Sequence, residues 1–157
     1  MEEFRAFYKK QQDKLLSYLM RITGDYHLSM DLMQESFTRY FEKYANNTRN
    51  VSLLFTIARN SFLDHKRKTG RLVALDQDYE DLSANQADSF QIKQECMRAL
   101  SAMKILEDDE REILALVLSG ELNYKEIASV TNTSEANIKV KVHRARIKIK
   151  KKLNAGE

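Results

Sequence analysis

The stretch EIASVTNTSEANIKVKVHRARIKIKKKL, residues 126–153, holds the pattern that decides this fold. An apolar segment of helical periodicity breaks at TNTS, and a second amphipathic segment starts directly after the break. Asn132 tolerates the left-handed backbone that such a turn needs, and the hydroxyl of Ser134 suits a helix N-cap. Ala128 is small enough for two helices to cross closely. Two helices joined by so short a turn are typical of a helix-turn-helix.

The second helix of this unit combines an apolar stripe with a basic outer face. In a helical projection, one side is apolar and should face the core: Ile138, Val142, Ala145 and Ile149. The opposite side is small at its start and basic further on: Ala136, Lys139, Val140, His143 and Arg144. Residues 135–152 hold eight Lys or Arg and one acidic residue. Such a helix suits a DNA major groove, with flanking lysines on the phosphates.

A simpler interpretation of these charges, without DNA binding, stays open for part of the helix. A lysine-rich helix end is often only a solvated face that complements the helix dipole. For residues 148–153, KIKKKL, this explanation fits as well as DNA binding does. For the whole unit, the turn residue, the cap, the apolar stripe and the basic face agree with one another, which favours DNA binding.

Composition indicates an all-α protein outside the membrane. The 157 residues include no Pro and only four Gly, the two residue types that break helices. No apolar run approaches the ~20 residues of a membrane span, and MEEFRAFYKK at the N-terminus lacks the apolar core of a signal peptide. A single Cys excludes an intrachain disulfide. We therefore expect a cytoplasmic protein without membrane insertion.

Charge and periodicity divide the chain into two helical domains. Residues 1–69 carry a net charge of +4, residues 70–90 a net charge of −4, and residues 91–157 a net charge of +3. Apolar periodicity predicts helices over about 3–22, 27–44, 51–69, 89–106, 107–120, 123–130 and 134–153. The expected architecture is an N-terminal three-helix bundle (1–70), a flexible acidic linker (71–89) and a C-terminal four-helix domain with the helix-turn-helix (90–157).

Several segments resemble the extracytoplasmic-function (ECF) group of bacterial sigma factors in the sigma-70 family. In the C-terminal half they are LEDDEREILAL (106–116), NYKEIASV (123–130) and IKVKVHRAR (138–146). In the N-terminal half, DLMQESFTRYFEKY (31–44) resembles the family's polymerase-docking helix, and LLFTIARNSFLDHKRK (53–68) resembles its promoter-opening helix. The segments occur in the family's order and cover nearly the whole chain.

The resemblance implies a function and assigns roles to residues. A sigma factor binds core RNA polymerase, directs it to promoters and helps to open the −10 region. The residues expected to dock on the β′ clamp helices are Asp31, Gln34 and Glu35. Those expected at the −35 element are Ser134, Asn137, Lys139, Val140, Lys141, His143 and Arg144. Those expected at the −10 element are Asn46, Asn47, Arg49, Asn50, Arg59, Asn60, Asp64, Lys66 and Arg67.

Further partners and some departures follow from the same resemblance. The β flap of the polymerase is a second expected contact, and family members are often held inactive by an anti-sigma factor. The chain has Leu53 where the family commonly has Trp, Asn132 where it commonly has Gly, and Thr133 in place of an aliphatic residue. For Arg59, pairing with an inner carboxylate is an alternative to a DNA contact.

Three other classes of function fit the sequence less well. A stand-alone helix-turn-helix regulator would bind DNA, typically as a dimer, through the same C-terminal helices. An enzyme such as a nuclease finds no support, because His27, His65 and His143 are far apart in the chain and Cys96 lacks partners. A purely structural adaptor would leave the basic face unexplained. We expect no catalytic residue, metal or cofactor.

Overall fold

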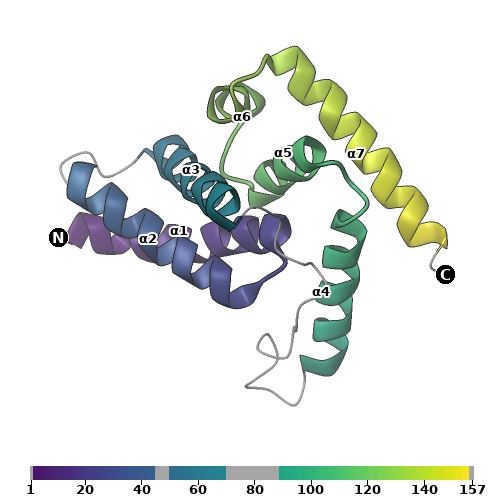
Figure 1. The fold of residues 1–157 in the computed structure, drawn as a ribbon, viewed down its shortest axis with the longest axis horizontal. Helices are drawn as coiled ribbons and strands as arrows, with labels where there is room; N and C mark the ends of the chain where they lie inside the picture. Colours follow the sequence, from purple (N-terminus) through teal and green to yellow (C-terminus); the bar gives the residue numbers. More distant parts are fainter. Residues whose placement is uncertain (1, 45–49, 70–88, 156–157) are drawn as a thin grey trace.

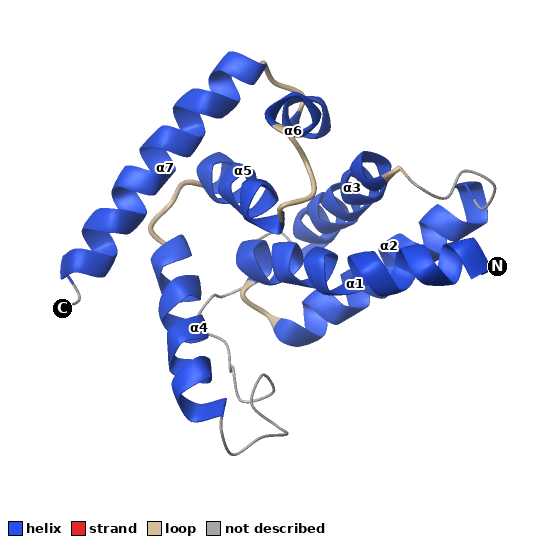
Figure 2. Cartoon of the chain, turned by 180° about the vertical axis from the view of Figure 1, so that it is seen from behind, coloured by secondary structure: helices blue, strands red, loops and turns tan. Residues whose placement is uncertain are grey.

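The computed structural model describes residues 2–44, 50–69 and 89–155, without the side chains of 89–93, 95 and 96. In these ranges the chain forms seven helices and no strand, which confirms the all-α class. The helices are α1 (Glu2–Thr23), α2 (Tyr26–Tyr44), α3 (Val51–Thr69), α4 (Ser89–Met103), α5 (Asp108–Ser119), α6 (Tyr124–Thr131) and α7 (Glu135–Ala155) (Figures 1 and 2). Residues 70–88, nearly all of the predicted linker, lie outside the described ranges.

The first three helices form the predicted bundle around an aromatic core. Phe7 of α1 stacks on Tyr40 of α2 with ring centroids 5.2 Å apart, and Tyr18 meets Phe55 of α3 at 5.4 Å. Tyr18, Tyr40 and Phe55 are fully buried. Aromatic side chains bury large areas with few rotamers, so this cluster fixes how the three helices lie against one another. Gly24, with φ of 69°, makes the tight turn from α1 to α2.

Helix α5 is capped at both ends, and α4 ends three residues earlier than predicted. Glu107 and Glu110 form a reciprocal capping box at the start of α5, and Gly120 ends that helix in the left-handed region. The helix predicted over 89–106 ends at Met103, because 104–106 make tighter turns before the cap. In those turns the amide of Leu106 bonds the carbonyl of Met103 and the Leu106 side chain is buried.

The helix-turn-helix has the geometry that its sequence predicts. Asn123 and Glu126 form a capping box at the start of α6, and Asn132 ends α6 with φ of 56° and ψ of 46°. The amide of Thr133 then donates to the carbonyl of Ala128 over 3.0 Å. Asn132 is the only described non-glycine residue with positive φ. The turn therefore depends on a residue type that tolerates this conformation.

The two halves pack directly on each other. Helix α1 lies along α5, and α3 lies beside α6, so α5 sits between the N-terminal bundle and α7 (Figures 1 and 2). Most of the buried apolar residues of both halves form one continuous cluster. Lys14 of α1 also pairs with Glu121, just after α5. The sequence predicted two domains but not this close contact between them.

Substitution at Asn132 tests the turn. We expect Asn132→Val to lower the free energy of unfolding by about 1–2 kcal/mol, because a β-branched residue is strained in the left-handed region. Asn132→Gly should change it by less than about 1 kcal/mol, because Gly adopts that region without strain. Urea unfolding followed by circular dichroism measures both. Equal stability of the Val variant and the wild type would contradict the importance of this conformation.

Candidate nucleic-acid interface

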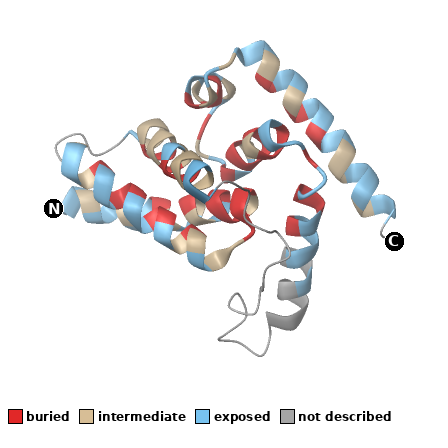
Figure 3. Ribbon diagram, viewed as in Figure 1, coloured by how far each residue is buried: buried red, intermediate tan, exposed pale blue. Residues whose placement is uncertain are grey.

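The outer face of α7 is open to solvent, as its sequence predicts. Ile138, Val142 and Ala145 are buried, whereas Lys139, Val140, His143 and Arg144 on the opposite side are all exposed. Buried and exposed positions alternate along α7 (Figure 3). Val140 is 44% exposed although it is a large apolar residue. A protruding apolar side chain among cations can contact a thymine methyl group while the cations contact phosphates or guanine edges. The face therefore has the chemistry of a major-groove helix.

Polar residues at the start of α7 hold the turn together. The amide of Asn137 donates to the Ser134 hydroxyl over 3.0 Å, which is the predicted N-cap. The side-chain amide of Asn137 donates to the Thr133 hydroxyl over 2.9 Å. Thr133, which departs from the family pattern, thus gives the turn an extra hydrogen bond. Ser134 and Asn137 position the start of α7 as well as lying near its outer face.

Lys141 differs from the other predicted DNA contacts on α7. Its ammonium pairs with the carboxylate of Asp109 on α5 at 2.6 Å, and its side chain is only 19% exposed. This hydrogen bond raises the pKa of Lys141 and lowers the pKa of Asp109. Next to Asp109 in α5, the buried carboxylate of Glu110 accepts a hydrogen bond from Lys148 over 2.7 Å. Lys141 and Lys148 therefore tie α7 to α5.

A second predicted surface lies on α2. Asp31, Gln34 and Glu35 are all exposed, while Leu32 and Met33 are buried in the bundle. Within this face, Glu35 pairs with Arg39, one helical turn away, at 2.6 Å. The structure thus brings the three predicted docking residues together on one polar face.

The residues predicted at the −10 element are only partly described. Asn46, Asn47 and Arg49 lie outside the described residues. Asn50 is exposed and caps α3, with its side-chain oxygen accepting from the amide of Leu53 over 3.0 Å. Asn60 is exposed on α3, and Arg67 pairs with Asp64 on the same helix.

Two cations of α3 pair with carboxylates of the C-terminal half. Arg59 pairs with Glu112 of α5 at 2.6 Å and also donates to the carbonyl of Val130 at 3.4 Å. Lys66 pairs with Asp108 of α5 at 2.9 Å, and this hydrogen bond lowers the pKa of Asp108. The inner carboxylate considered for Arg59 is therefore Glu112. Sequence reasoning could not identify it, because it lies more than fifty residues further along the chain.

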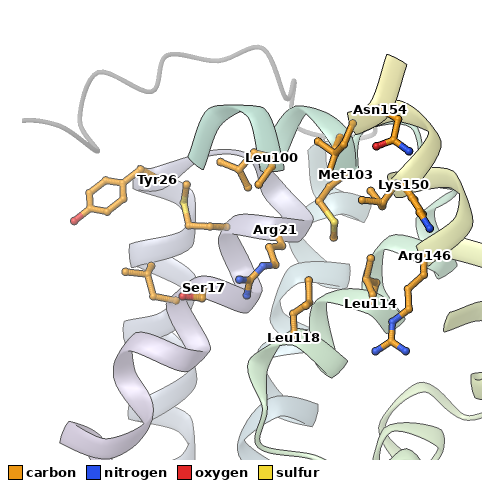
Figure 4. A pocket seen from close by; sticks show the side chains of 16 residues that line it. Ser17, Arg21, Tyr26, Leu100, Met103, Leu114, Leu118, Arg146, Lys150 and Asn154 are labelled. Carbon is orange, nitrogen blue, oxygen red and sulfur yellow. The ribbon is translucent and has the colours of Figure 1, made fainter. Parts of the chain in front are cut away.

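An apolar groove is the feature that sequence reasoning missed. It has a volume of about 640 Å³ and lies where α4, α5 and α7 meet α1 (Figure 4). Its apolar walls are Leu16 and Met20 of α1, Leu100 and Met103 of α4, Leu114 and Leu118 of α5, and Ile149 and Leu153 of α7. Arg21, Arg146 and Lys150 add positive charge. No sequence pattern marked the groove, because Leu118 continues the apolar pattern of α5 and only the structure shows that it is 49% exposed.

Metal sites and membrane spans can be judged for the described part of the chain. No group of three His, Cys, Asp or Glu residues there is placed to hold a metal ion. Nor is any helix in the described ranges both long and apolar enough to span a membrane.

Comparisons with known proteins match both halves of the chain. Residues 7–72 match the family described as Sigma-70 region 2, and residues 96–149 match Sigma-70, region 4. The ECF RNA polymerase sigma factor SigM of Bacillus subtilis is 34% identical over 156 residues, covering 95% of this chain and 94% of SigM. RNA polymerase sigma factor YlaC of the same organism is 25% identical, covering 97% of this chain and 92% of YlaC.

A solved structure resembles the whole fold. It is the sigma factor RpoE in complex with the anti-sigma factor NepR from Bartonella quintana. The TM-score is 0.76 at 20% identity, and the match covers 100% of both chains. The likeness therefore extends over both helical halves.

Removing two cations from the outer face of α7 tests its role. We expect Lys139→Ala with Arg144→Ala to weaken binding to duplex DNA by about tenfold or more, because each base or phosphate contact is worth ~1–3 kcal/mol. The slope of log affinity against log salt should become shallower by about 2. Fluorescence anisotropy at several salt concentrations measures both. Lys9→Ala with Lys10→Ala, on exposed positions of α1, is the charge-matched control, and an equal effect of both pairs would contradict the assignment.

Proposed function

Because this chain belongs to the ECF RNA polymerase sigma factors of the sigma-70 family, we propose that its separate surfaces divide the work of promoter recognition. It is an alternative sigma factor, which binds core RNA polymerase and directs it to promoters. In our proposal residues 1–70 dock on the polymerase and open the −10 region, residues 90–157 bind the −35 element, and residues 71–89 join them.

Binding of the −35 element is assigned to α7. The single observation that carries the proposal is its outward face, where Lys139, Val140 and Arg144 are all exposed while the apolar stripe is buried. Ala136 at the start of that face lets the helix approach the bases closely. Lys150, Lys151 and Lys152, in the last turns, would contact phosphates and add salt-dependent affinity without sequence preference. Ser134 and Asn137 would hold the start of the helix at the right angle.

Opening of the −10 region is assigned to α3 and the segment before it. Asn46, Asn47 and Asn50 can pair with the edges of a base that leaves the stack, and Arg49 with phosphate. Extrusion of a base costs a few kcal/mol, which such contacts would offset. Arg59, Asn60, Asp64, Lys66 and Arg67 would lie along the displaced strand. Arg59 and Lys66 must first leave their carboxylate partners on α5.

Docking on the polymerase is assigned to two faces. The acidic face of α2, with Asp31, Gln34 and Glu35, would meet the β′ clamp helices. The apolar groove beside Leu118 would receive the β flap, because its apolar walls suit an amphipathic segment and its basic residues suit acidic flanks. An anti-sigma factor would be a third partner, in line with the complex formed by the structurally similar RpoE.

The remaining assignments follow from the family. Sigma factors are transcription initiation factors, and RNA synthesis itself belongs to the polymerase. We therefore propose that this chain has no enzymatic activity of its own and needs no cofactor. Its place of action would be the cytoplasm, where the polymerase works.

Reconstituted transcription tests the proposed function directly. Purified chain is mixed with bacterial core RNA polymerase and a library of random-sequence DNA, and the 5′ ends of the transcripts are sequenced. We expect transcripts to start downstream of two shared sequence elements. If the chain ignores the polymerase yet selects specific duplexes alone, it is a stand-alone regulator and the proposal is wrong.

Charge reversal on α2 tests the clamp contact. We expect Asp31→Arg with Glu35→Arg to weaken binding to core polymerase by at least about tenfold, because like charges in an interface repel. Glu2→Arg with Asp13→Arg changes the net charge equally at exposed positions of α1. Biolayer interferometry with immobilised core enzyme measures both. Unaltered affinity of the first variant would remove α2 from the docking site.

A charge placed in the apolar groove tests the flap contact. Leu118 is 49% exposed, so Leu118→Glu should leave the fold intact. A docked apolar segment would bury the new charge, which costs free energy. We expect about tenfold weaker binding to core polymerase. Ile105→Glu is the matched control, because Ile105 is 42% exposed and does not line the groove. Equal affinities of the two variants in the same assay would refute the groove as a docking site.

A further inference from the structure

Two ion pairs join α7 to α5 along one flank of α7. Lys141 pairs with Asp109 at 2.6 Å, and Lys148 pairs with Glu110 at 2.7 Å. The two lysines are seven residues apart, so they lie on the same side of α7, about two turns and 10 Å apart along its axis. Their partners are adjacent in the first turn of α5. Both pairs lie within the C-terminal half and connect the same two helices at two points.

The flank that carries these pairs lies beside the proposed reading face. At about 100° per residue, Lys141 and Lys148 lie roughly 80–100° around the helix from Val140, between the outer face and the buried apolar stripe. The other flank carries three exposed cations, which are Lys139, Arg146 and Lys150. The pairs therefore hold α7 on the side away from these cations and leave its outer face open.

Apolar burial alone leaves the rotation of α7 about its own axis loosely defined. The buried stripe consists of Ile138, Val142 and Ala145, and hydrophobic burial has no direction. For a side-chain tip about 6 Å from the axis, a rotation of about 20° is a movement of about 2 Å. A recognition contact has to be held within about 0.5 Å and 10–20°. Charge-assisted hydrogen bonds are short and geometrically specific, so the two pairs can set the rotation that closely.

The carboxylates of both pairs are themselves fixed by the backbone of α5. Asp109 accepts a hydrogen bond from the amide of Glu110 over 2.8 Å, and Glu110 accepts one from the amide of Glu107 over 3.2 Å. Lys141 is only 19% exposed, whereas Arg144 on the outer face is exposed. The ammonium of Lys141 is thus directed at a fixed carboxylate of its own chain and is poorly placed to meet a phosphate.

We propose that Asp109 and Lys141, supported by the Glu110–Lys148 pair, are positioning residues for recognition of the −35 element. They hold α7 at the rotation in which Val140 and Arg144 meet base edges, and Lys141 keeps its carboxylate partner when DNA is bound. The inference rests on the proposed function and deepens the assignment of the −35 element to α7. It replaces the sequence expectation that Lys141 itself contacts DNA.

Discrimination between two DNA sequences is the quantity that tests positioning. One DNA carries the upstream element selected in the transcription experiment, and the other carries the same bases scrambled. Fluorescence anisotropy gives the ratio of the affinities of the free chain for the two duplexes. Transcript yields from two templates that differ only in this element give the corresponding ratio for the chain bound to core polymerase.

Lys141→Met removes the ammonium and keeps the apolar stem of the side chain. We expect both ratios to fall about fivefold, because a reading face that is free to rotate spends less time in register with the bases. Affinity for the scrambled duplex should change by less than about twofold, and the slope of log affinity against log salt should stay the same. If both affinities fall alike and the slope becomes shallower by about 0.9, Lys141 contacts phosphate and the proposal is wrong.

Asp109→Asn separates positioning from electrostatic attraction, because it makes the chain more positive. We expect the ratios to fall about fivefold here as well, although the added charge favours binding to any DNA. The double variant with Lys141→Met should lose no more than either single variant, since both changes remove one pair. Lys141→Arg, which keeps a cation beside Asp109, should retain at least about half of the discrimination. Losses that add in the double variant, or unchanged ratios in Asp109→Asn, would overturn the proposal.

Matched variants control for charge and for stability. Lys9→Met and Asp13→Asn make the same changes of charge at exposed positions of α1, and should leave the ratios within about twofold of the wild type. A merely structural role of the Asp109–Lys141 pair would increase the unfolded fraction and lower the affinities for both duplexes alike. Urea unfolding followed by circular dichroism measures that fraction. Loss of stability with unchanged ratios would contradict a positioning role.

Positioning and the proposed function would fail in different ways. If the wild-type chain discriminates between the two sequences and the Lys141 and Asp109 variants discriminate equally well, positioning is wrong and the proposed function stands. If the wild-type chain supports no promoter-dependent transcription, no element is selected, and the proposed function falls together with the inference.

Discussion

Helix α5 and its acidic beginning are the feature on which the rest of the structure depends. Its apolar residues Ile113, Ala115 and Leu116 are buried, and it contacts α1, α6 and α7. Arg111, only 7% exposed, donates to the carbonyls of Met103 and Leu106, at 3.0 and 2.8 Å, and so fixes the path from α4 into α5. Helix α5 packs against α6 and α7 on one side and against α1 on the other. Folding of the C-terminal half therefore also forms the surface that α1 covers.

The carboxylates of α5 combine several electrostatic effects. At a helix N-terminus they complement the macrodipole, and Glu110 also caps the backbone amide of Glu107. Burial opposes ionisation of Glu110, but the hydrogen bond from Lys148, the backbone amide of Glu107 and the charge of Lys148 together outweigh it and lower the pKa of Glu110. Asp108 makes a comparable pair with Lys66 at a more exposed position, where salt screens it more strongly. Salt should therefore weaken the Asp108–Lys66 pair more than the Glu110–Lys148 pair.

The arrangement of surfaces suggests how a short chain can serve a large assembly. A polar face on α2 and a basic face on α7 point outward, so the partners proposed for them, polymerase and −35 DNA, can reach them in this arrangement. Of the −10 contacts proposed on α3, Arg59 and Lys66 face α5, and the groove is partly walled by α1. Interfaces between domains of one chain resemble transient protein interfaces, so Arg59 and Lys66 can leave their carboxylates when a partner supplies other anions.

Local chemistry by itself determined much of this protein. The periodicity of apolar residues located all seven described helices, Asn132 and Ser134 located the turn, and the outer face of α7 followed from projection alone, because each depends on residues within one or two turns. Asn46, Asn47 and Arg49 fall outside the described residues, and their roles at the −10 element stay predictions. Tertiary structure alone decided that Arg59 meets Glu112, that Lys141 turns to Asp109, and that a groove opens beside Leu118. These contacts join residues distant in the chain, and no local pattern records which distant partners folding brings together.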